Sequence, residues 1–196
     1  MSTRPISRRT QAEYLQLDRQ SELRHEFLDG EVRAMTGASR HHNLITVNVA
    51  ATLSEQLRHR QCEVYASDMR VKVSPQRLYA YPDVIVVCGT PCFEDEANDT
   101  LLNPTILIEV LSKSTEAYDR GLKFELYRGL ESLQEFILIA QNKCHIEHYR
   151  RQSDNRWILT ETKDPAGLII LESITGQLAV DQIYLKVALD LPTSTE

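Results

Sequence analysis

Two acidic residues stand inside apolar segments that have the composition of buried strands. Asp83 follows Pro82 and precedes four β-branched residues, and Glu109 lies within the run Ile-Leu-Ile-Glu-Val-Leu at 106–111. A buried carboxylate without a partner costs several kcal/mol, so each acid needs a cation, a proton or hydrogen-bond donors. The chain therefore requires a fold that neutralises both acids, and a shared divalent metal ion would serve both.

Hydrophobic periodicity predicts a mixed sheet with helices packed against it. Apolar residues at helical spacing predict a helix over 42–58, and Thr115 with its neighbouring serines supplies capping hydroxyls for another over 116–128. Asp29-Gly30 between two short apolar runs predicts a hairpin over 24–35. The remaining elements are a short helix over 10–20 and strands over 63–73, 82–88, 105–111, 133–140, 143–150, 156–162 and 168–171.

The length and composition of the chain fit one domain. A chain of 196 residues with 42% apolar content can bury a substantial core. We expect a single domain over 1–196, with a core at about 40–141, an N-terminal helix and hairpin at 10–36, and a C-terminal strand extension at 143–190.

The sequence shows no segment that would direct the protein to a membrane. No stretch approaches the ~18 apolar residues of a transmembrane helix, and the basic N-terminus lacks the apolar segment of a signal peptide. We therefore expect a soluble, cytoplasmic protein without a membrane partner. The cysteines form no CxxC pair and complete no tetrahedral metal site, so reduced thiols are expected at Cys62, Cys88, Cys92 and Cys144.

Strand periodicity places the two acids where they can meet. Glu109 and Asp83 each share a strand face with the apolar residues two positions away, so neighbouring strands can bring both carboxylates to one point. On the helix expected at 116–128, Asp119, Lys123 and Tyr127 follow one another at intervals of four. They form a polar stripe that can overhang the carboxylates.

Several short motifs occur in a fixed order over residues 10–150. They are RHEFLDGE at 24–31, His42, Pro82-Asp83-Val84, IEVLSKST at 108–115, Asp119, Lys123 and Tyr127, and Glu135-Phe136-Ile137. Together they resemble a restriction-endonuclease-like family expanded in cyanobacteria, a divergent branch of the PD-(D/E)xK nuclease superfamily. The resemblance implies an α/β fold of the α+β mixed-sheet type. Its restriction-endonuclease-like core would be helix, three strands, helix and strand, with an extra N-terminal hairpin and extra C-terminal strands.

The same resemblance implies roles for individual residues. Asp83 corresponds to the acid of the PD motif and Glu109 to the first acid of the ExK element. The position of the usual lysine holds Leu111, a departure typical of this branch, in which the lysine is found on the next helix. Lys123 is therefore the candidate catalytic lysine and Lys113 a weaker one. The implied accessory residues are Glu26, His42, Asp119 and Tyr127.

The chemistry implied by these residues is metal-assisted hydrolysis of a phosphodiester bond. Asp83, Glu109 and the backbone carbonyl of Val110 would supply hard oxygen ligands for Mg²⁺ or Mn²⁺. Lys123 would stabilise the charge that develops on the phosphate. The expected partner is nucleic acid, DNA ahead of RNA, and a homodimer is expected by analogy with restriction-like nucleases that cut two strands.

The charge pattern leaves the partner undecided. A formal net charge of -6 argues mildly against a broad nucleic-acid-binding surface, because neutralisation of phosphates dominates such binding. The basic residues at 40–42 and 58–60 could still line a local groove, although charge runs are more often solvated faces. His145 and His148 lie three apart in a predicted strand and point to opposite faces, so we interpret both as ordinary edge residues.

Three simpler interpretations remain open from the residues alone. Asp83, at the start of a strand, could simply accept hydrogen bonds from turn amides. Glu109 could form a structural ion pair with Lys123 or Arg70, and Asp119 with Lys123 could be an exposed helix pair that contributes ~0.3–0.5 kcal/mol. The protein would then be a nuclease fold without catalysis that binds nucleic acid or another protein, because a fold alone does not secure an activity.

Overall fold

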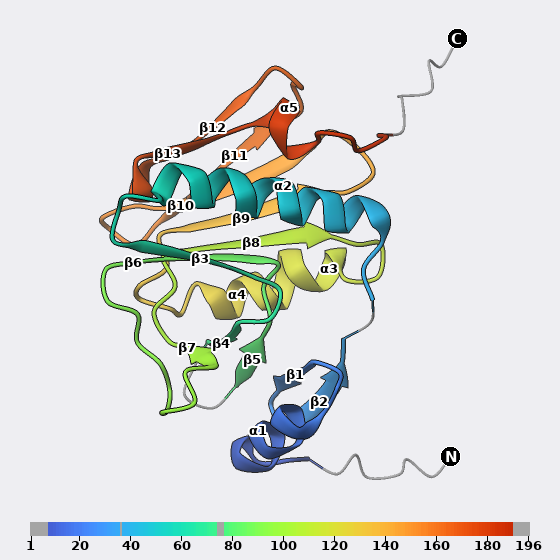
Figure 1. Cartoon of the computed structure of the whole chain (residues 1–196), viewed down its shortest axis with the longest axis vertical. Helices are drawn as coiled ribbons and strands as arrows, with labels where there is room; N and C mark the ends of the chain where they lie inside the picture. Colours follow the sequence, from blue (N-terminus) through green and yellow to red (C-terminus); the bar gives the residue numbers. More distant parts are fainter. Residues whose placement is uncertain (1–7, 36, 74–76, 190–196) are drawn as a thin grey trace.

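Three of the predicted strands form the centre of a six-stranded mixed sheet (Figure 1). The structure is a computed structural model that describes residues 8–35, 37–73 and 77–189. The predicted N-terminal segment ends at residue 36 and the predicted C-terminal extension at residue 190, and both of these residues lie outside the described ranges. β8 and β9 are parallel and the other neighbours are antiparallel. The strand order is β11 (Trp157–Thr162), β10 (Ile146–Arg151), β9 (Glu135–Ala140), β8 (Ile106–Leu111), β6 (Val84–Cys88) and β3 (Cys62–Ala66). The predicted mixed sheet is confirmed.

One face of this sheet is covered by the long helix α2 (Arg40–Leu57) (Figure 1). Its buried side chains recur every four residues and join the core formed with β6, β8 and β9: Ile45, Val49, Leu53 and Leu57. The Ser39 hydroxyl accepts a hydrogen bond from the His42 N–H at 3.1 Å, so the helix begins two residues before its predicted start. No helix within the described ranges is long and apolar enough to cross a lipid bilayer.

The opposite face is covered by one continuous helical segment that links the parallel strands β8 and β9. It consists of α3 (Glu116–Tyr118), the π-helical turn η1 (Asp119–Lys123) and α4 (Phe124–Tyr127). A parallel pair needs a crossover of this kind. The sheet residues buried with α4 are Ile85, Val87, Leu107 and Leu111. They belong to the strand faces assigned to Asp83 and Glu109, so both acids lie on the side of this helix.

The single strand predicted over 63–73 is wrong, because the chain divides there between two sheets. β3 ends before Ser67, which has a φ of 54°, a backbone conformation that does not continue a strand. β4 (Arg70–Lys72) then enters a five-stranded sheet beside α4 (Figure 1). The order of this second sheet is β2 (Glu31–Ala34), β1 (His25–Leu28), β5 (Leu78–Ala80), β4 and β7 (Thr100–Leu101). The hairpin predicted over 24–35 is confirmed as β1 and β2.

The N-terminal helix α1 (Gln11–Gln20) anchors the second sheet. Its Tyr14 ring is fully buried, with its centroid 5.2 Å from those of both Phe27 and Tyr79. The Asp18 carboxylate, also without solvent exposure, accepts a hydrogen bond from Arg70 Nη2 at 2.8 Å. Arg70 therefore pairs with Asp18 of α1, and it is not the ion-pair partner of Glu109.

The C-terminal segment extends the core on the side of α2. The strands predicted over 143–150, 156–162 and 168–171 are confirmed as β10, β11 and β12 (Leu168–Leu171). The elements that follow are η2 (Glu172–Ile174), β13 (Gly176–Ala179) and α5 (Val180–Ile183). β12 and β13 form a two-stranded sheet, and its buried side chains join the α2 core: Ile169, Leu171 and Leu178.

The expectation of four reduced cysteines is wrong for one pair. Antiparallel pairing of β3 with β6 places Cys62 directly opposite Cys88, and the two form a disulfide. Periodicity gave no sign of this pairing, because a sequence separation of 26 residues hides the register of the two cysteines. Cys92 and Cys144 are free thiols, as expected.

Candidate active site

The antiparallel pairing of β6 with β8 brings the two strand acids together. Val84 pairs with Ile108, so Asp83 and Glu109 occupy the next position of the same register. Asp83 Oδ2 accepts a hydrogen bond from the Val110 N–H at 2.7 Å. The backbone of β8 therefore fixes the carboxylate that precedes β6.

The first turn of α2 supplies a second contact to Asp83. His42 Nε2 lies 3.2 Å from Asp83 Oδ2, and both side chains are largely buried. The Ser39 cap explains this placement, because it starts α2 at the end of the sheet where β6 begins and where Asp83 lies. His42 is thus in position to orient Asp83.

Lys123 lies among three further carboxyl groups. Its Nζ is 2.9 Å from Glu109 Oε1, 3.0 Å from Glu26 Oε1 and 3.5 Å from Asp119 Oδ1. The Tyr127 hydroxyl donates a hydrogen bond to Glu109 Oε1 at 2.8 Å. Lys123 and Asp119 are only 5% and 3% exposed, so the interpretation of an exposed helix pair is wrong.

A π-helical turn carries Asp119 and Lys123 into this cluster. Residues Asp119–Lys123 form the π turn, and α4 continues directly to Tyr127. A π turn inserts extra backbone into a helix and is frequent at functional sites. The sequence predicted the polar stripe correctly, but it gave no indication that the helix would widen between the two charged residues.

Burial and mutual repulsion dominate the electrostatics of the cluster. Burial raises the pKa of Glu109 to about 8; Lys123 opposes this shift, and the charges of Asp119 and Asp83 add to it. Burial also raises the pKa of Asp119. Burial alone would lower the pKa of Lys123, but Glu109 and the surrounding acids outweigh it and raise that pKa well above its usual value. Lys123 therefore stays charged, while Glu109 retains a proton at neutral pH.

The donor set of the site suits a hard divalent cation. Asp83, Glu109, Glu26 and Asp119 offer carboxylate oxygens, the ligand type that Mg²⁺ and Mn²⁺ prefer. Three acids around Lys123, with Asp83 beside Glu109, leave an excess of negative charge, which a divalent ion would neutralise by displacing the retained proton. Asp83, just before β6, lies beside Glu109 of the neighbouring strand β8, so the two acids meet as strand periodicity predicted.

The two candidate lysines differ sharply in position. Leu111 is 3% exposed at the position of the usual lysine, whereas Lys123 reaches Glu109 from the next helix. Lys113 is exposed in the loop after β8 and makes no ion pair with a described acid. Of the two, only Lys123 is in contact with the predicted acids.

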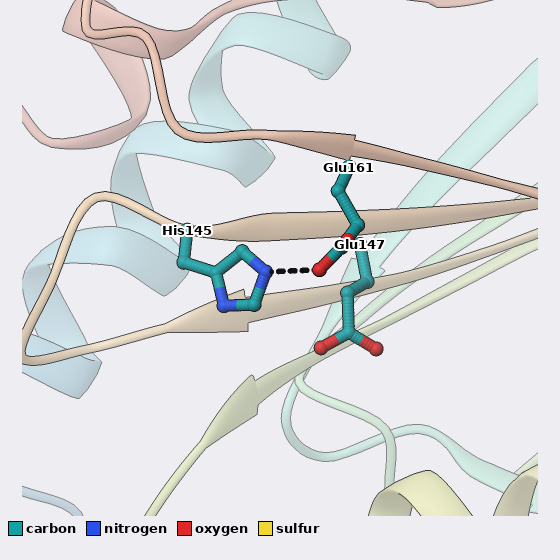
Figure 2. A group of neighbouring side chains, drawn as sticks. All are labelled: His145, Glu147 and Glu161. Atoms are coloured by element: carbon teal, nitrogen blue, oxygen red, sulfur yellow. Dashed lines mark hydrogen bonds and ion pairs between the residues drawn. The ribbon is translucent and has the colours of Figure 1, made fainter.

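A second polar group, at the far edge of the sheet, was missed by the sequence analysis. Figure 2 shows His145 at the start of β10, Glu147 on β10 and Glu161 on β11, with a hydrogen bond of 2.7 Å between His145 Nε2 and Glu161 Oε1. One potential ligand atom from each lies within 4.8 Å of the others. The signal for this group is that Glu147 and Glu161 stand opposite each other on β10 and β11, and only the register of the two strands reveals it.

The guanidinium of Arg120 already neutralises charge in this second group. Arg120 donates to Glu147 Oε1 at 2.8 Å through Nε, and the Tyr149 hydroxyl donates to Glu147 Oε2 at 2.9 Å. Both oxygens of Glu147 therefore have donors, and the guanidinium would repel a metal ion placed beside it. We interpret the group as a structural network, which leaves the cluster around Lys123 as the candidate active site.

Comparison with known proteins places this geometry in a family. The family Uma2, described as "Putative restriction endonuclease", matches residues 11–187. Two proteins of Synechocystis sp., both described as uncharacterized, are similar over most of their length. One is 40% identical over 152 residues, covering 78% of this chain and 86% of that protein. The other is 33% identical over 180 residues, covering 92% and 93%.

A solved structure has the same fold. It is a crystal structure from Anabaena variabilis, described as a putative nuclease belonging to DUF820, with a TM-score of 0.75. At 17% identity it covers 90% of this chain and 97% of that chain. The predicted restriction-endonuclease-like fold is confirmed, and the descriptions of the family and of this structure support a nuclease-like function.

Proposed function

This chain belongs to the Uma2 family, and from that premise we propose that it is a metal-dependent nuclease that hydrolyses phosphodiester bonds. Its catalytic residues would be Asp83, Glu109 and Lys123. The observation that carries the proposal is the group of acids on β1, β8 and η1 that contact Lys123, with Asp83, just before β6, close enough to Glu109 to help raise its pKa. A purely structural ion pair does not need this excess of carboxylates.

Each residue of the cluster has a role that its contacts support. Asp83, Glu109 and the backbone carbonyl of Val110 would hold Mg²⁺ or Mn²⁺, which when bound lowers the pKa of a water and neutralises charge on the phosphate. Lys123 contributes a fixed positive charge toward the oxygens of the reacting phosphate. The positioning residues are His42 for Asp83, Tyr127 for Glu109, and Glu26 and Asp119 for Lys123.

The substrate we propose is DNA, with RNA as the alternative. The described part of one copy presents one candidate site, and by analogy with restriction-like nucleases that pair to cut two strands we propose a homodimer. Light scattering at micromolar concentration tests this assembly: a mass of twice 22.5 kDa supports the dimer, and a mass of 22.5 kDa contradicts it.

One observation favours a second function. Leu111 replaces the usual lysine and is buried, and loss of a catalytic group is the route by which a nuclease fold becomes a binding module. In that case Lys123 would serve only to neutralise the acids. The nuclease requires a bound metal ion and the charge of Lys123 for cleavage, whereas the binding module requires neither for catalysis.

Cleavage of a mixed DNA and RNA panel with Mn²⁺ tests the proposal. We would compare the wild type with Asp83→Ala and Lys123→Ala, and use Asp154→Asn as a control. Asp154 is an exposed acid that binds Arg156 in the β10–β11 turn. Each protein is first checked by circular dichroism, and metal binding is measured by calorimetry.

The outcomes separate the two functions. Cleavage by the wild type and Asp154→Asn, with loss in both site variants, supports the nuclease and the role of Lys123. Weaker Mn²⁺ binding in Asp83→Ala supports the metal site independently of cleavage. A folded, metal-saturated wild type that cuts nothing overturns the nuclease and favours the binding module.

A further inference from the structure

A cavity of about 590 Å³ opens beside the candidate active site. It lies where the N-terminus of α2 meets the loops that follow β8 and β9. Pockets for small ligands fall within ~300–1,000 Å³, so this space can hold a unit the size of a nucleotide. Leu111 and Ala140, both nearly fully buried, form its apolar inner end.

Unpaired basic side chains line this cavity. Arg40, His41 and Lys113 make no hydrogen bond or ion pair with any other described side chain. The acid in the lining, Glu116, is already paired with Arg120. The cavity is therefore locally positive on a chain whose formal net charge is -6, and a concave surface of one sign concentrates ions of the other sign.

The start of α2 adds to this positive character. Ser39 uses its hydroxyl to accept the His42 N–H, and also donates to Gln141. The first backbone N–H groups of an 18-residue helix carry a partial positive charge and favour an anion. Arg40 and His41 lie in this first turn, so side chains and backbone favour the same kind of ligand.

The cavity and the acid cluster share two segments of chain. His41 lines the cavity and the next residue, His42, contacts Asp83. Leu111 lines the cavity two residues after Glu109, a distance of about 6.6 Å along a strand. The cavity thus adjoins the acids at both segments, and a strand that continues from the acids toward the start of α2 enters it.

We propose that this cavity binds the nucleotide adjoining the scissile phosphodiester, with Arg40, His41 and Lys113 contacting its phosphate. The inference rests on the proposed nuclease function and assigns a role to Arg40, His41 and Lys113, which the catalytic mechanism does not use. Arg40 offers a planar fork of donors that matches a phosphate, and Lys113 a mobile point charge. The apolar inner end leaves room for the sugar and base.

Binding without cleavage tests this proposal separately from catalysis. Fluorescence anisotropy would follow labelled single-stranded and duplex oligonucleotides in EDTA, where no metal is available for hydrolysis. The variant is Arg40→Ala with Lys113→Ala. The control, Arg58→Ala with Lys163→Ala, removes the same charge from exposed positions, one of them at the other end of α2. Thermal unfolding would verify that both variants are folded.

The pocket variant should bind oligonucleotides on the order of tenfold more weakly at low salt, while the control stays near the wild type. The slope of log K against log salt should also fall, by about 0.7 for each phosphate of a single strand that the variant no longer neutralises. Inorganic phosphate at equal ionic strength should compete far less than an oligonucleotide if a linked nucleotide, and not a free phosphate, is the ligand.

Three results would overturn the inference: equal affinities of the pocket variant and the control, no binding by the wild type at low salt, or phosphate that competes as well as the oligonucleotide. Weaker binding by the pocket variant, together with a wild type that never cleaves, would leave the pocket standing and overturn only the nuclease.

Discussion

Replacement of Lys123 by methionine should destabilise the protein strongly, and by an amount that depends on pH. Lys123 Nζ contacts three carboxyl groups within 3.5 Å, and the side chain is only 5% exposed. Methionine keeps most of the stem but removes the charge, so the acids lose their cation. Removal of one partner from a buried ion pair costs about 3–5 kcal/mol, and we expect that loss of unfolding free energy at pH 8.

The cost of this substitution should shrink as the pH falls. The pKa of Glu109 is about 8 in the folded protein, above its ordinary value of 4.5, so the folded state binds the extra proton. The stability that this proton provides is present below pH 4.5 and is lost as the pH rises through about 8. At pH 5 the protonated Glu109 needs no lysine, and the stability of Lys123→Met should then lie closer to that of the wild type.

A divalent metal should partly restore the variant. An ion bound among the acids stabilises the folded state by about 2.7 kcal/mol at a hundred times its Kd. Urea unfolding of wild type and Lys123→Met, with and without millimolar Mg²⁺ at pH 5 and pH 8, measures both effects. The matched control is Lys72→Met, because Lys72 forms one ion pair, with Glu94, away from the site, where both side chains are nearly a fifth exposed.

The control leaves one acid without its cation where Lys123→Met leaves three, so it should lose less unfolding free energy and gain nothing from Mg²⁺. The reasoning would be refuted if Lys123→Met were no less stable than Lys72→Met at pH 8, or if its deficit were the same at both pH values. Absence of Mg²⁺ stabilisation in both the wild type and Lys123→Met would contradict the metal site while leaving the electrostatic argument intact.

Three further predictions follow from other parts of the structure. Reduction of the Cys62–Cys88 disulfide, whose cysteines are 26 residues apart, should lower the unfolding free energy by about 3 kcal/mol, and denaturation with and without dithiothreitol checks this; equal midpoints would contradict it. Affinity for Mn²⁺ should rise about tenfold per pH unit up to the Glu109 pKa of about 8, because the ion must displace a proton; a flat calorimetric profile between pH 6 and 8 would exclude Glu109 as a ligand. Arg70→Met should cost about 3–5 kcal/mol, because it leaves Asp18 buried without its cation, whereas Arg70→Met with Asp18→Leu should recover much of that loss in thermal unfolding.

The central strands and the two acids could be predicted from the sequence because their signals are local. An acid inside a β-branched run must be neutralised wherever the strand packs, so Asp83 and Glu109 were identifiable before any neighbour was known. The same holds for α2, whose apolar residues at intervals of four define a buried face. The spacing of Asp119, Lys123 and Tyr127 likewise fixed a common helix face.

The errors arose where the outcome depends on register or on a single backbone dihedral. The strand predicted over 63–73 continues in its apolar pattern, but the left-handed conformation of Ser67 divides it between two sheets. Cys62 and Cys88 meet only because β3 and β6 are antiparallel in one particular register. Neither fact has a local signal, since each depends on which strand lies alongside.

The sequence by itself determined which residues require neutralisation and on which faces of their elements they lie, because propensity and periodicity act over a few residues. Only the tertiary structure decided that Glu26 of the hairpin contacts Lys123, that the Val110 N–H donates to Asp83, and that Arg70 pairs with Asp18. It also placed basic residues of two distant segments around one cavity. These contacts join residues far apart in the chain, and only the packing of the whole sheet fixes their distances.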